Sequence, residues 1–188
     1  MRFWRIFSIV CTTLLLLFAL IAIAITSSST QGPASNAQPD SLSSAAISLE
    51  RTVCYGSCPS YVVTLKGDGT VEYVGRNFVK AQGPQHSTIK TEVLKSLMDE
   101  FARGGFMTIA DTYSEEKCRC VLCTDMPSAI TRLTTNGVTH TVNHYYGCRC
   151  APRSLFDLER AIDKAANVEQ WTGDTSKSGP FGTTCAGE

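Results

Sequence analysis

The pattern of apolar and polar positions changes sharply near the start of the chain. Residues 6–25 form an uncharged, mostly apolar run that follows Arg2 and Arg5. As a helix this run is about 30 Å long, the thickness of the hydrocarbon core of a bilayer. Residues 27–45 are rich in Ser, Ala, Gln and Pro and show no apolar period. The pattern therefore predicts a membrane segment over residues 1–26, followed by a flexible linker.

Alternation of apolar and polar residues predicts three strands after residue 46. A Gly67-Asp68-Gly69 turn joins the second strand to the third, because its glycines accept positive φ. The polar stretch 75–85 predicts a loop or a short edge strand. The residues expected on one face are Ile47, Leu49, Arg51 and Val53, then Tyr61, Val63 and Leu65, then Val71 and Tyr73.

Apolar residues at helical spacing predict two amphipathic helices. The first begins at Thr91 and stops at Gly104-Gly105, and the second begins at Pro152, which suits a first helical turn. A second hairpin over residues 128–146 turns at Asn136-Gly137. The apolar stripes are Val93, Leu94, Leu97, Met98 and Phe101 in the first helix, and Leu155, Leu158, Ile162 and Ala165 in the second.

These elements predict an α+β domain over residues 46–172. Strands joined by tight turns pair antiparallel, and one-sided alternation means that a single face of the sheet is covered. We expect an antiparallel sheet of about five strands, in the order βββαββα, with two helices packed on one face. Residues 173–188 are polar and glycine-rich, which predicts a flexible tail.

The chain has nine cysteines, and eight of them lie outside the apolar N-terminal run. An even number of cysteines predicts a disulfide framework formed in an oxidising compartment. Spacing favours a bridge between Cys54 and Cys58 across a turn. It also favours bridges from the 148–150 segment to the 118–123 segment, with the remaining cysteine bonded to Cys185. The predicted disulfide cysteines are Cys54, Cys58, Cys118, Cys120, Cys123, Cys148, Cys150 and Cys185.

Five short stretches carry a family resemblance. They are Ile47–Thr52, Cys54–Pro59, Gly67–Val71, Thr124–Pro127 and the segment Pro152–Asp163 with its Leu-Glu-x-Ala-Ile-Asp run. Together they resemble a bacterial family of domains of unknown function, DUF6438, over about Ile47 to Trp171. The resemblance implies no activity. The cysteines between residues 118 and 150 lie where the family pattern has none, so they look like an added staple.

The N-terminal run and the cysteines together predict export. The run is longer than the apolar core of a cleaved signal peptide, about 7–15 residues, so it favours an uncleaved single-pass anchor. Ala22-Ile23-Ala24 leaves cleavage and secretion as the alternative. With the basic flank in the cytoplasm, we expect residues 6–25 in the bacterial inner membrane and the domain in the periplasm or outside the cell.

Cys54 and Cys58 also admit a reactive role. The Cys-x3-Cys-Pro pattern resembles the copper site of Sco-type assembly proteins, and it would suit a thiol-redox pair. A reactive thiol usually needs a helix N-terminus or a nearby cation to lower its pKa. Here a predicted strand follows Pro59, which favours a structural disulfide.

Other candidate chemistry is weaker. A zinc site of four thiolates from residues 118–150 conflicts with an oxidising compartment. His140 and His144 are about 13 Å apart along one strand, too far to share an ion. Asp125, His144 and Tyr145 remain possible binding residues. A hydrolase built on Asp125 lacks a nucleophile.

The chain carries equal numbers of basic and acidic residues, 17 each, with no basic stripe. This balance argues against a nucleic-acid partner. No cofactor motif is present in the sequence. The function predicted from the sequence is an exported, membrane-tethered, disulfide-stabilised binding or structural module of the cell envelope, and the sequence favours this role over an enzyme without settling the question. The alternative is a periplasmic thiol-redox or Cu(I)-handling protein that uses Cys54 and Cys58.

Overall fold

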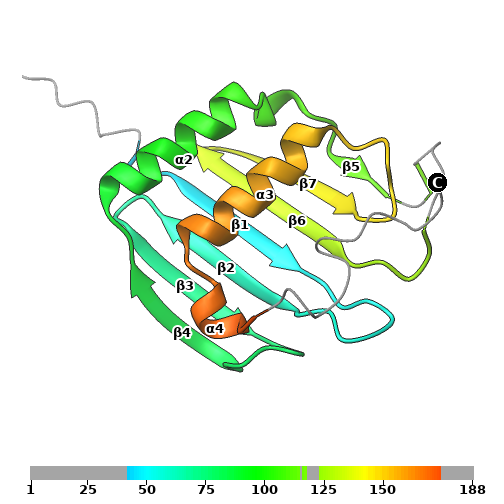
Figure 1. Ribbon diagram of the computed structural model, residues 1–188. Coiled ribbons are helices and arrows are strands. Elements are labelled where there is room, and N and C mark those ends of the chain that lie inside the picture. Colours follow the sequence, from blue (N-terminus) through cyan, green and yellow to red (C-terminus); the bar gives the residue numbers. More distant parts are fainter. Residues whose placement is uncertain (1–41, 115, 118–122, 175–188) are drawn as a thin grey trace, which may run out of the picture. The chain divides into compact units, whose positions relative to one another are not determined.

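The central element of the fold is a mixed β-sheet (Figure 1). The computed structural model describes residues 42–114, 116–117 and 123–174. The sheet has seven strands in the order β4-β3-β2-β1-β6-β7-β5. They are β1 (Ala46–Arg51), β2 (Tyr61–Lys66), β3 (Thr70–Gly75), β4 (Gly83–Thr88), β5 (Thr112–Tyr113), β6 (Ser128–Thr135) and β7 (Val138–Tyr145).

Helices α2 (Thr91–Arg103) and α3 (Arg153–Ala165) cover one face of this sheet, as predicted (Figure 1). Both are amphipathic, and their apolar stripes meet the inward side chains of the strands. A short 3-10 helix, η1 (Phe106–Thr108), follows α2, and α4 (Glu169–Thr172) follows α3. The two main helices contribute to the core Leu94, Leu97 and Phe101 from α2, and Leu155, Leu158 and Ile162 from α3.

The prediction of a purely antiparallel sheet of about five strands is wrong in two places. Strand β4 is the edge of the sheet, and none of its residues is fully buried. Hydrogen bonds to β3 hold this strand in place. Its sequence has no alternating apolar face from which a strand could be predicted. Strand β5 has two residues and runs parallel to β7, with Thr112 opposite Asn143. Two residues are too few to show the alternation of apolar and polar positions that predicts a strand.

Helix α4 closes the core beyond α3. Trp171 stacks on Tyr73, with ring centroids 4.8 Å apart, and its carbonyl accepts the N–H of Ala81 at 2.8 Å. Trp171 is 7% exposed, so this short element covers the end of the sheet near β3.

The chain enters the sheet at one end and reaches its candidate site at the other. Leu42 lies beside Gly67, where an added Cβ would come within 1.8 Å of the Leu42 carbonyl oxygen. Only glycine fits there. Strand β1 then runs about 17 Å to Arg51 and the cysteine turn.

None of the helices in the described part of the chain is both long and apolar enough to cross a bilayer. The segment 6–25, on which the predicted membrane anchor depends, lies outside the described residues.

Candidate functional site

Arg51 is a charged residue on the apolar face of the sheet. It ends β1, and its side chain is 3% exposed. Its inward position follows from the alternation that also points Ile47 and Leu49 into the core. A buried guanidinium needs anionic and hydrogen-bond partners to offset lost hydration. Those partners come from β2, α3 and the residue after β7.

Asp163 of α3 is the direct anion for this guanidinium. Arg51 donates from Nη2 and from Nε to Asp163 Oδ2, at 2.6 and 3.0 Å. The Tyr61 hydroxyl lies 3.2 Å from Arg51 Nε and donates to Asp163 Oδ1 at 2.7 Å. Both carboxylate oxygens of Asp163 are therefore held in place, which fixes the orientation of the group.

The hydrogen bonds continue deeper under α3. Arg51 Nη1 donates to the Tyr146 hydroxyl at 2.6 Å, and that hydroxyl donates to Glu159 Oε2 at 2.6 Å. His144 Nδ1 lies 2.8 Å from Glu159 Oε1, and neither of these two side chains is exposed at all. We call these six residues the buried polar network: Arg51, Tyr61, His144, Tyr146, Glu159 and Asp163.

Aromatic rings surround the inner end of this network. Tyr146 stacks on His144 at 4.8 Å, and Phe156 meets His144 edge-on at 4.3 Å. His144 Nε2 has no hydrogen-bond partner among the described residues. The inner half of the network is therefore fully buried, and its outer half, around Asp163, approaches solvent.

Burial shifts the proton equilibria of the network. It raises the pKa of Asp163, and this effect outweighs the opposing effect of Arg51. Burial would lower the pKa of Arg51, but Asp163, Tyr146, Tyr61 and Glu159 together keep it well above its ordinary value. The pKa values of Tyr61 and Tyr146 are also raised, first by burial, so both hydroxyls keep their protons at neutral pH.

A pocket of about 470 Å³ opens above the outer half of the network. Its floor includes Arg51, Tyr61 and Asp163, and its walls come from the end of α3 and from α4. Pro59, which closes the cysteine turn, also lines it. A second hollow, of about 730 Å³, lies between the outer faces of α2 and α3. The side chains that line it include no fully buried ionisable group, so the first pocket is the candidate site.

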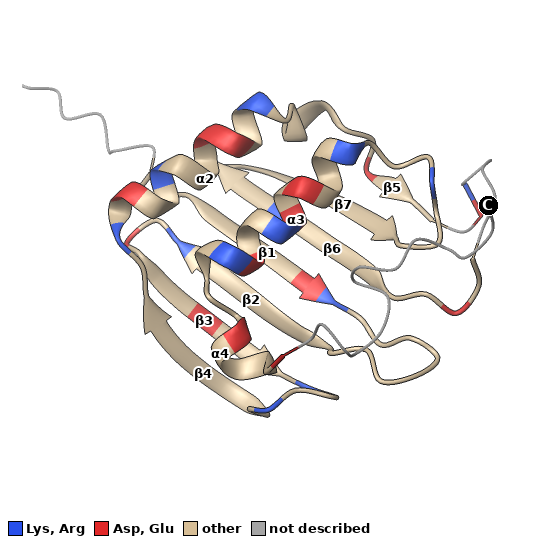
Figure 2. Ribbon diagram, viewed as in Figure 1, with Lys and Arg blue, Asp and Glu red and all other residues tan. Residues whose placement is uncertain are grey.

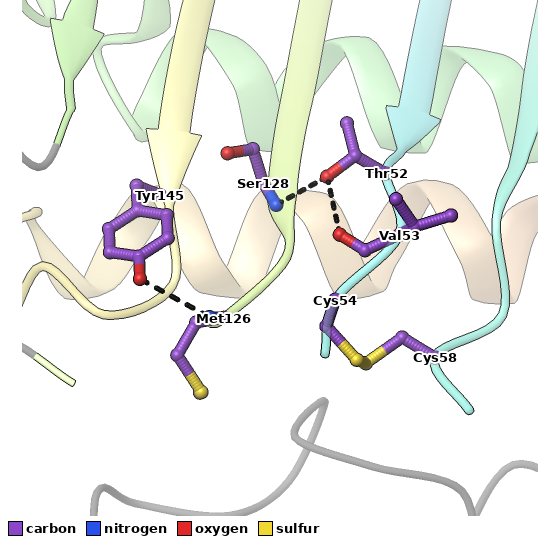
Figure 3. The surroundings of a disulfide bond; sticks show 7 residues. All are labelled: Thr52, Val53, Cys54, Cys58, Met126, Ser128 and Tyr145. Carbon is purple, nitrogen blue, oxygen red and sulfur yellow. Dashed lines mark hydrogen bonds between the residues drawn. A yellow bond between two sulfur atoms is a disulfide. The ribbon is translucent and has the colours of Figure 1, made fainter. Parts of the chain in front are cut away.

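The cysteine turn beside this pocket contains the predicted disulfide bond. Cys54 and Cys58 are bonded, with their Cα atoms 5.7 Å apart (Figure 3). The turn is attached to the β6 end of the sheet, where Thr52 Oγ1 accepts the N–H of Ser128 at 2.7 Å. The Tyr55 N–H donates to the Asp125 carbonyl at 3.1 Å. Cys58 is fully buried, and Tyr55 at the tip is 90% exposed.

Three further cysteines among the described residues, Cys123, Cys148 and Cys150, are also disulfide-bonded. Cys118, Cys120 and Cys185 lie outside the described residues. The pairing predicted among these six cysteines therefore stays a prediction.

The possible binding residues named from the sequence lie in different environments. His144 is in the buried polar network. Tyr145, the next residue of the strand, points to the other side of the sheet, where its hydroxyl donates to the Cys123 carbonyl and accepts the N–H of Met126. Asp125 is exposed, has a φ of 65°, and contacts the Thr124 hydroxyl. No hydrogen bond among the described residues joins Asp125 to His144.

His140 has a hydrogen-bond partner of its own outside the buried polar network. Its Nε2 lies 2.9 Å from the Ile109 carbonyl oxygen. Within the described residues, no group of three or more His, Cys, Asp or Glu side chains is arranged to hold a metal ion.

The sequence prediction did not identify the network as a site, although the signal was present. Arg51 interrupts an apolar alternation, and His144 does the same on β7. Glu159 and Asp163 lie one helical turn apart in α3, on the side that also buries Leu155 and Ile162. A charged residue inside an apolar face, repeated on two strands and one helix, indicates a buried polar cluster.

Comparison with known proteins agrees with the resemblance seen in the sequence. A search of curated proteins finds no match to this chain. A family model described as "Domain of unknown function (DUF6438)" matches residues 45–166, from the start of β1 to the end of α3. The matched span includes all six members of the buried polar network, and the Leu-Glu-x-Ala-Ile-Asp run supplies Glu159 and Asp163. The chain therefore belongs to the DUF6438 family of domains of unknown function.

Proposed function

We propose that this protein is an exported, membrane-tethered binding module of the bacterial cell envelope, stabilised by disulfide bonds. The observation that carries the proposal is the bond between Cys54 and Cys58. Structural disulfides persist in oxidising compartments and are rare in the cytosol. The apolar run over residues 6–25, with Arg2 and Arg5 before it, supplies a route to such a compartment.

The position of the pocket supports a binding role for the tethered domain. Leu42, where the described chain begins, lies at the end of the sheet that carries Gly67. The pocket opens at the other end, beside Arg51 and Pro59. The first described residue and the pocket therefore lie at opposite ends of the sheet. A 470 Å³ pocket with a few fixed polar groups is within the size range of small-ligand sites.

The experiment is fractionation of cells that express the full chain, with thiols blocked at lysis. We expect the protein in the membrane fraction, digestible by protease added to spheroplasts, with Cys54 and Cys58 linked in non-reduced peptide maps. Cys11 lies in the apolar run and is the internal control, because we expect it to keep a free thiol. Intact mass distinguishes an uncleaved anchor from a cleaved signal. Protease-resistant protein with free thiols at both positions would contradict the proposal.

The alternative is a thiol-redox or Cu(I)-handling protein. Strand β2 begins at Tyr61, so no helix N-terminus follows the cysteine turn to stabilise a thiolate at Cys54 or Cys58. Full burial of Cys58 also opposes ready exchange. Stoichiometric Cu(I) uptake by the reduced protein, abolished by Cys58→Ser, would favour this alternative over the structural bond.

A further inference from the structure

Exposed apolar side chains gather at one end of the sheet. Of the seven large ones among the described residues, four lie there: Val53, Tyr55, Val74 and Phe78. They come from the β1–β2 loop, the end of β3 and the β3–β4 loop, and antiparallel pairing brings these segments to the end that carries Arg51. Figure 2 shows no charged residue along the β1–β2 loop. We call these four residues the apolar end.

The loop that carries Tyr55 is ordered before any contact is made. The disulfide between Cys54 and Cys58 closes it, and the Tyr55 N–H donates to the Asp125 carbonyl at 3.1 Å. An ordered loop loses little conformational freedom on binding, so less of the interaction energy is spent on ordering it. Tyrosine is also one of the residues that contribute most to protein–protein interfaces. Tyr55, at 90% exposure, therefore suits contact with another protein surface.

Phe78 provides a second, independent observation at the same end. Its φ is 53°, in the left-handed region that a bulky residue rarely adopts. Its neighbours anchor the loop on both sides, because the Asn77 carbonyl accepts the N–H of Ser60 at 2.9 Å and Val79 packs against the core. Between them the Phe78 side chain is left 56% exposed. A strained backbone that presents an aromatic ring to solvent is typical of a contact site.

Opposite charges lie on the two flanks of the apolar end. Lys80 lies on the β4 flank and on the helix side of the sheet, where its N–H donates to the Thr172 carbonyl of α4 at 3.3 Å. Asp125 lies on the β6 flank and on the other side, next to Met126, whose N–H donates to the Tyr145 hydroxyl. Both are exposed, and neither forms an ion pair within the described part of the chain. A half-turn about an axis along the strands exchanges these two flanks.

We propose that the apolar end binds a second copy of this chain, in a dimer whose two-fold axis runs along the strands. In such a dimer the same surface of both copies is buried. Tyr55 and Phe78 form its uncharged centre, and Lys80 faces Asp125 of the partner subunit at the rim. An aromatic centre depleted of charge, with a polar rim, is the usual composition of a protein interface. A membrane surface is less well matched, because anionic lipids attract basic clusters and this rim has both signs. The inference goes beyond the proposed function and does not depend on where the protein is located.

The test is sedimentation equilibrium of the full-length protein in detergent, over a concentration series from about 1 to about 200 μM, the range of a small interface. We expect a reversible equilibrium between monomer and dimer. Tyr55→Ser and Phe78→Ser should each weaken the dimer about tenfold or more, because each removes an aromatic anchor. Val138→Ser is the matched control, since Val138 is 57% exposed at the opposite end of the sheet and its loss should leave the dimer unchanged.

Two rim variants test the orientation of the copies. Lys80→Gln and Asp125→Asn should each weaken the dimer about two- to fivefold. Asparagine suits the φ of 65° at position 125. The double variant should lose no more than either single variant, because both changes remove the same contact.

Three results would overturn the inference: a monomer at every concentration, a dimer that neither aromatic variant weakens, or additive losses in the double rim variant. Association through the apolar run 6–25 would give the second of these results. Fractionation and peptide mapping test the proposed function separately, because neither depends on self-association.

Discussion

Arg51 shows how one residue can connect a fold and a site. Its guanidinium joins β1 to α3 through Asp163, across a sequence separation of 112 residues. It also orders Tyr61 and Tyr146, which complete the polar path to Glu159. A buried ion pair with extra hydrogen bonds adds little net stability when intact, but removal of one partner leaves an uncompensated charge.

The first prediction concerns that uncompensated charge. Arg51→Leu should lower the free energy of unfolding by about 3–5 kcal/mol, because Asp163 and Glu159 lose their buried cation. Arg76→Leu is the matched control, since Arg76 pairs with Glu50 at 2.6 Å on a surface where its own side chain is 48% exposed. The control should lose about 1 kcal/mol or less. Urea unfolding measures both free energies. Equal losses in the two variants would mean that the buried position of Arg51 does not increase the cost of removing its charge.

The second prediction concerns pH. Asp163 ionises near 3.8 when unfolded, and burial raises its pKa in the folded protein. The folded state therefore holds this proton more tightly, and the associated stability is full below that pH and is lost as pH rises through the folded value. Asp163→Asn does not titrate. The stability of the wild type relative to this variant should fall as pH rises above about 3.8. A constant or rising difference in urea midpoints would contradict the raised pKa.

At this scale the sequence reveals part of the site. Cys54 and Cys58 are identifiable because a bridge between near neighbours needs no knowledge of the fold. Arg51 is recognisable as a charged residue within an alternation of apolar residues. The sequence around Arg51 does not indicate that its partner is Asp163. The partner of a buried charge is set by tertiary packing, and a single sequence read by itself does not identify it.

Elements differ in how far their own sequence specifies them. Both main helices and the β6–β7 hairpin at Asn136-Gly137 follow from local periodicity and turn chemistry. Strand β4 does not, because its neighbour β3 supplies the hydrogen bonds that hold it. Helix α4 is four residues long and is stabilised by Trp171. Short elements of this kind exist because other elements pack against them.

The third prediction concerns Trp171. Trp171→Ala should destabilise the domain by about 3–5 kcal/mol, because it removes a buried ring that stacks on Tyr73. Met107→Ala is the control, since Met107 is 39% exposed and its loss should cost about 0.5 kcal/mol. Thermal unfolding followed by circular dichroism compares the two. Similar losses would show that α4 is not part of the cooperative core.

The fourth prediction compares disulfide bonds. In the chain-entropy model a bridge that closes the short loop from Cys54 to Cys58 stabilises by about 2 kcal/mol. A bridge from Cys148 or Cys150 to the 118–123 segment encloses about 30 residues and should give roughly 3–4 kcal/mol. The double variant Cys148→Ser with Cys150→Ser should therefore lose more stability than Cys54→Ser with Cys58→Ser. Equilibrium unfolding without reductant measures both, and the reverse order would refute the prediction.

The molecule as a whole keeps ionisable hydroxyls inside its core. Tyr61, Tyr73 and Tyr146 come from β2, β3 and the end of β7, and each is largely withdrawn from water. Burial raises the pKa of all three, to about 12 for Tyr73. Burial between the helical layer and the sheet thus keeps these three hydroxyls protonated at neutral pH.

The fifth prediction follows from those hydroxyls. Their contribution to stability is full below the ordinary tyrosine pKa of 10.0 and is lost as pH rises through the folded values. At about pH 11 the folded protein should show less tyrosinate absorbance than the urea-unfolded protein. The folded variant with Tyr61→Phe and Tyr146→Phe should show the same tyrosinate absorbance as the folded wild type at that pH. A lower tyrosinate absorbance in the folded variant than in the folded wild type would show that one of these two hydroxyls is ionised in the wild type at about pH 11.

The strand order also governs how the molecule forms. Strand β1, the first strand within the described residues, lies in the interior of the sheet, and one of its two neighbours is β6, with Ala46 opposite Thr134. Pairs so distant in sequence raise the contact order and slow folding, because a long loop must close first. During synthesis, the β1–β2 hairpin and its disulfide are able to assemble early. One edge of β1 then stays unpaired until residues 128–135 have been synthesised. During that interval the nascent chain is most prone to aggregation and most accessible to chaperones.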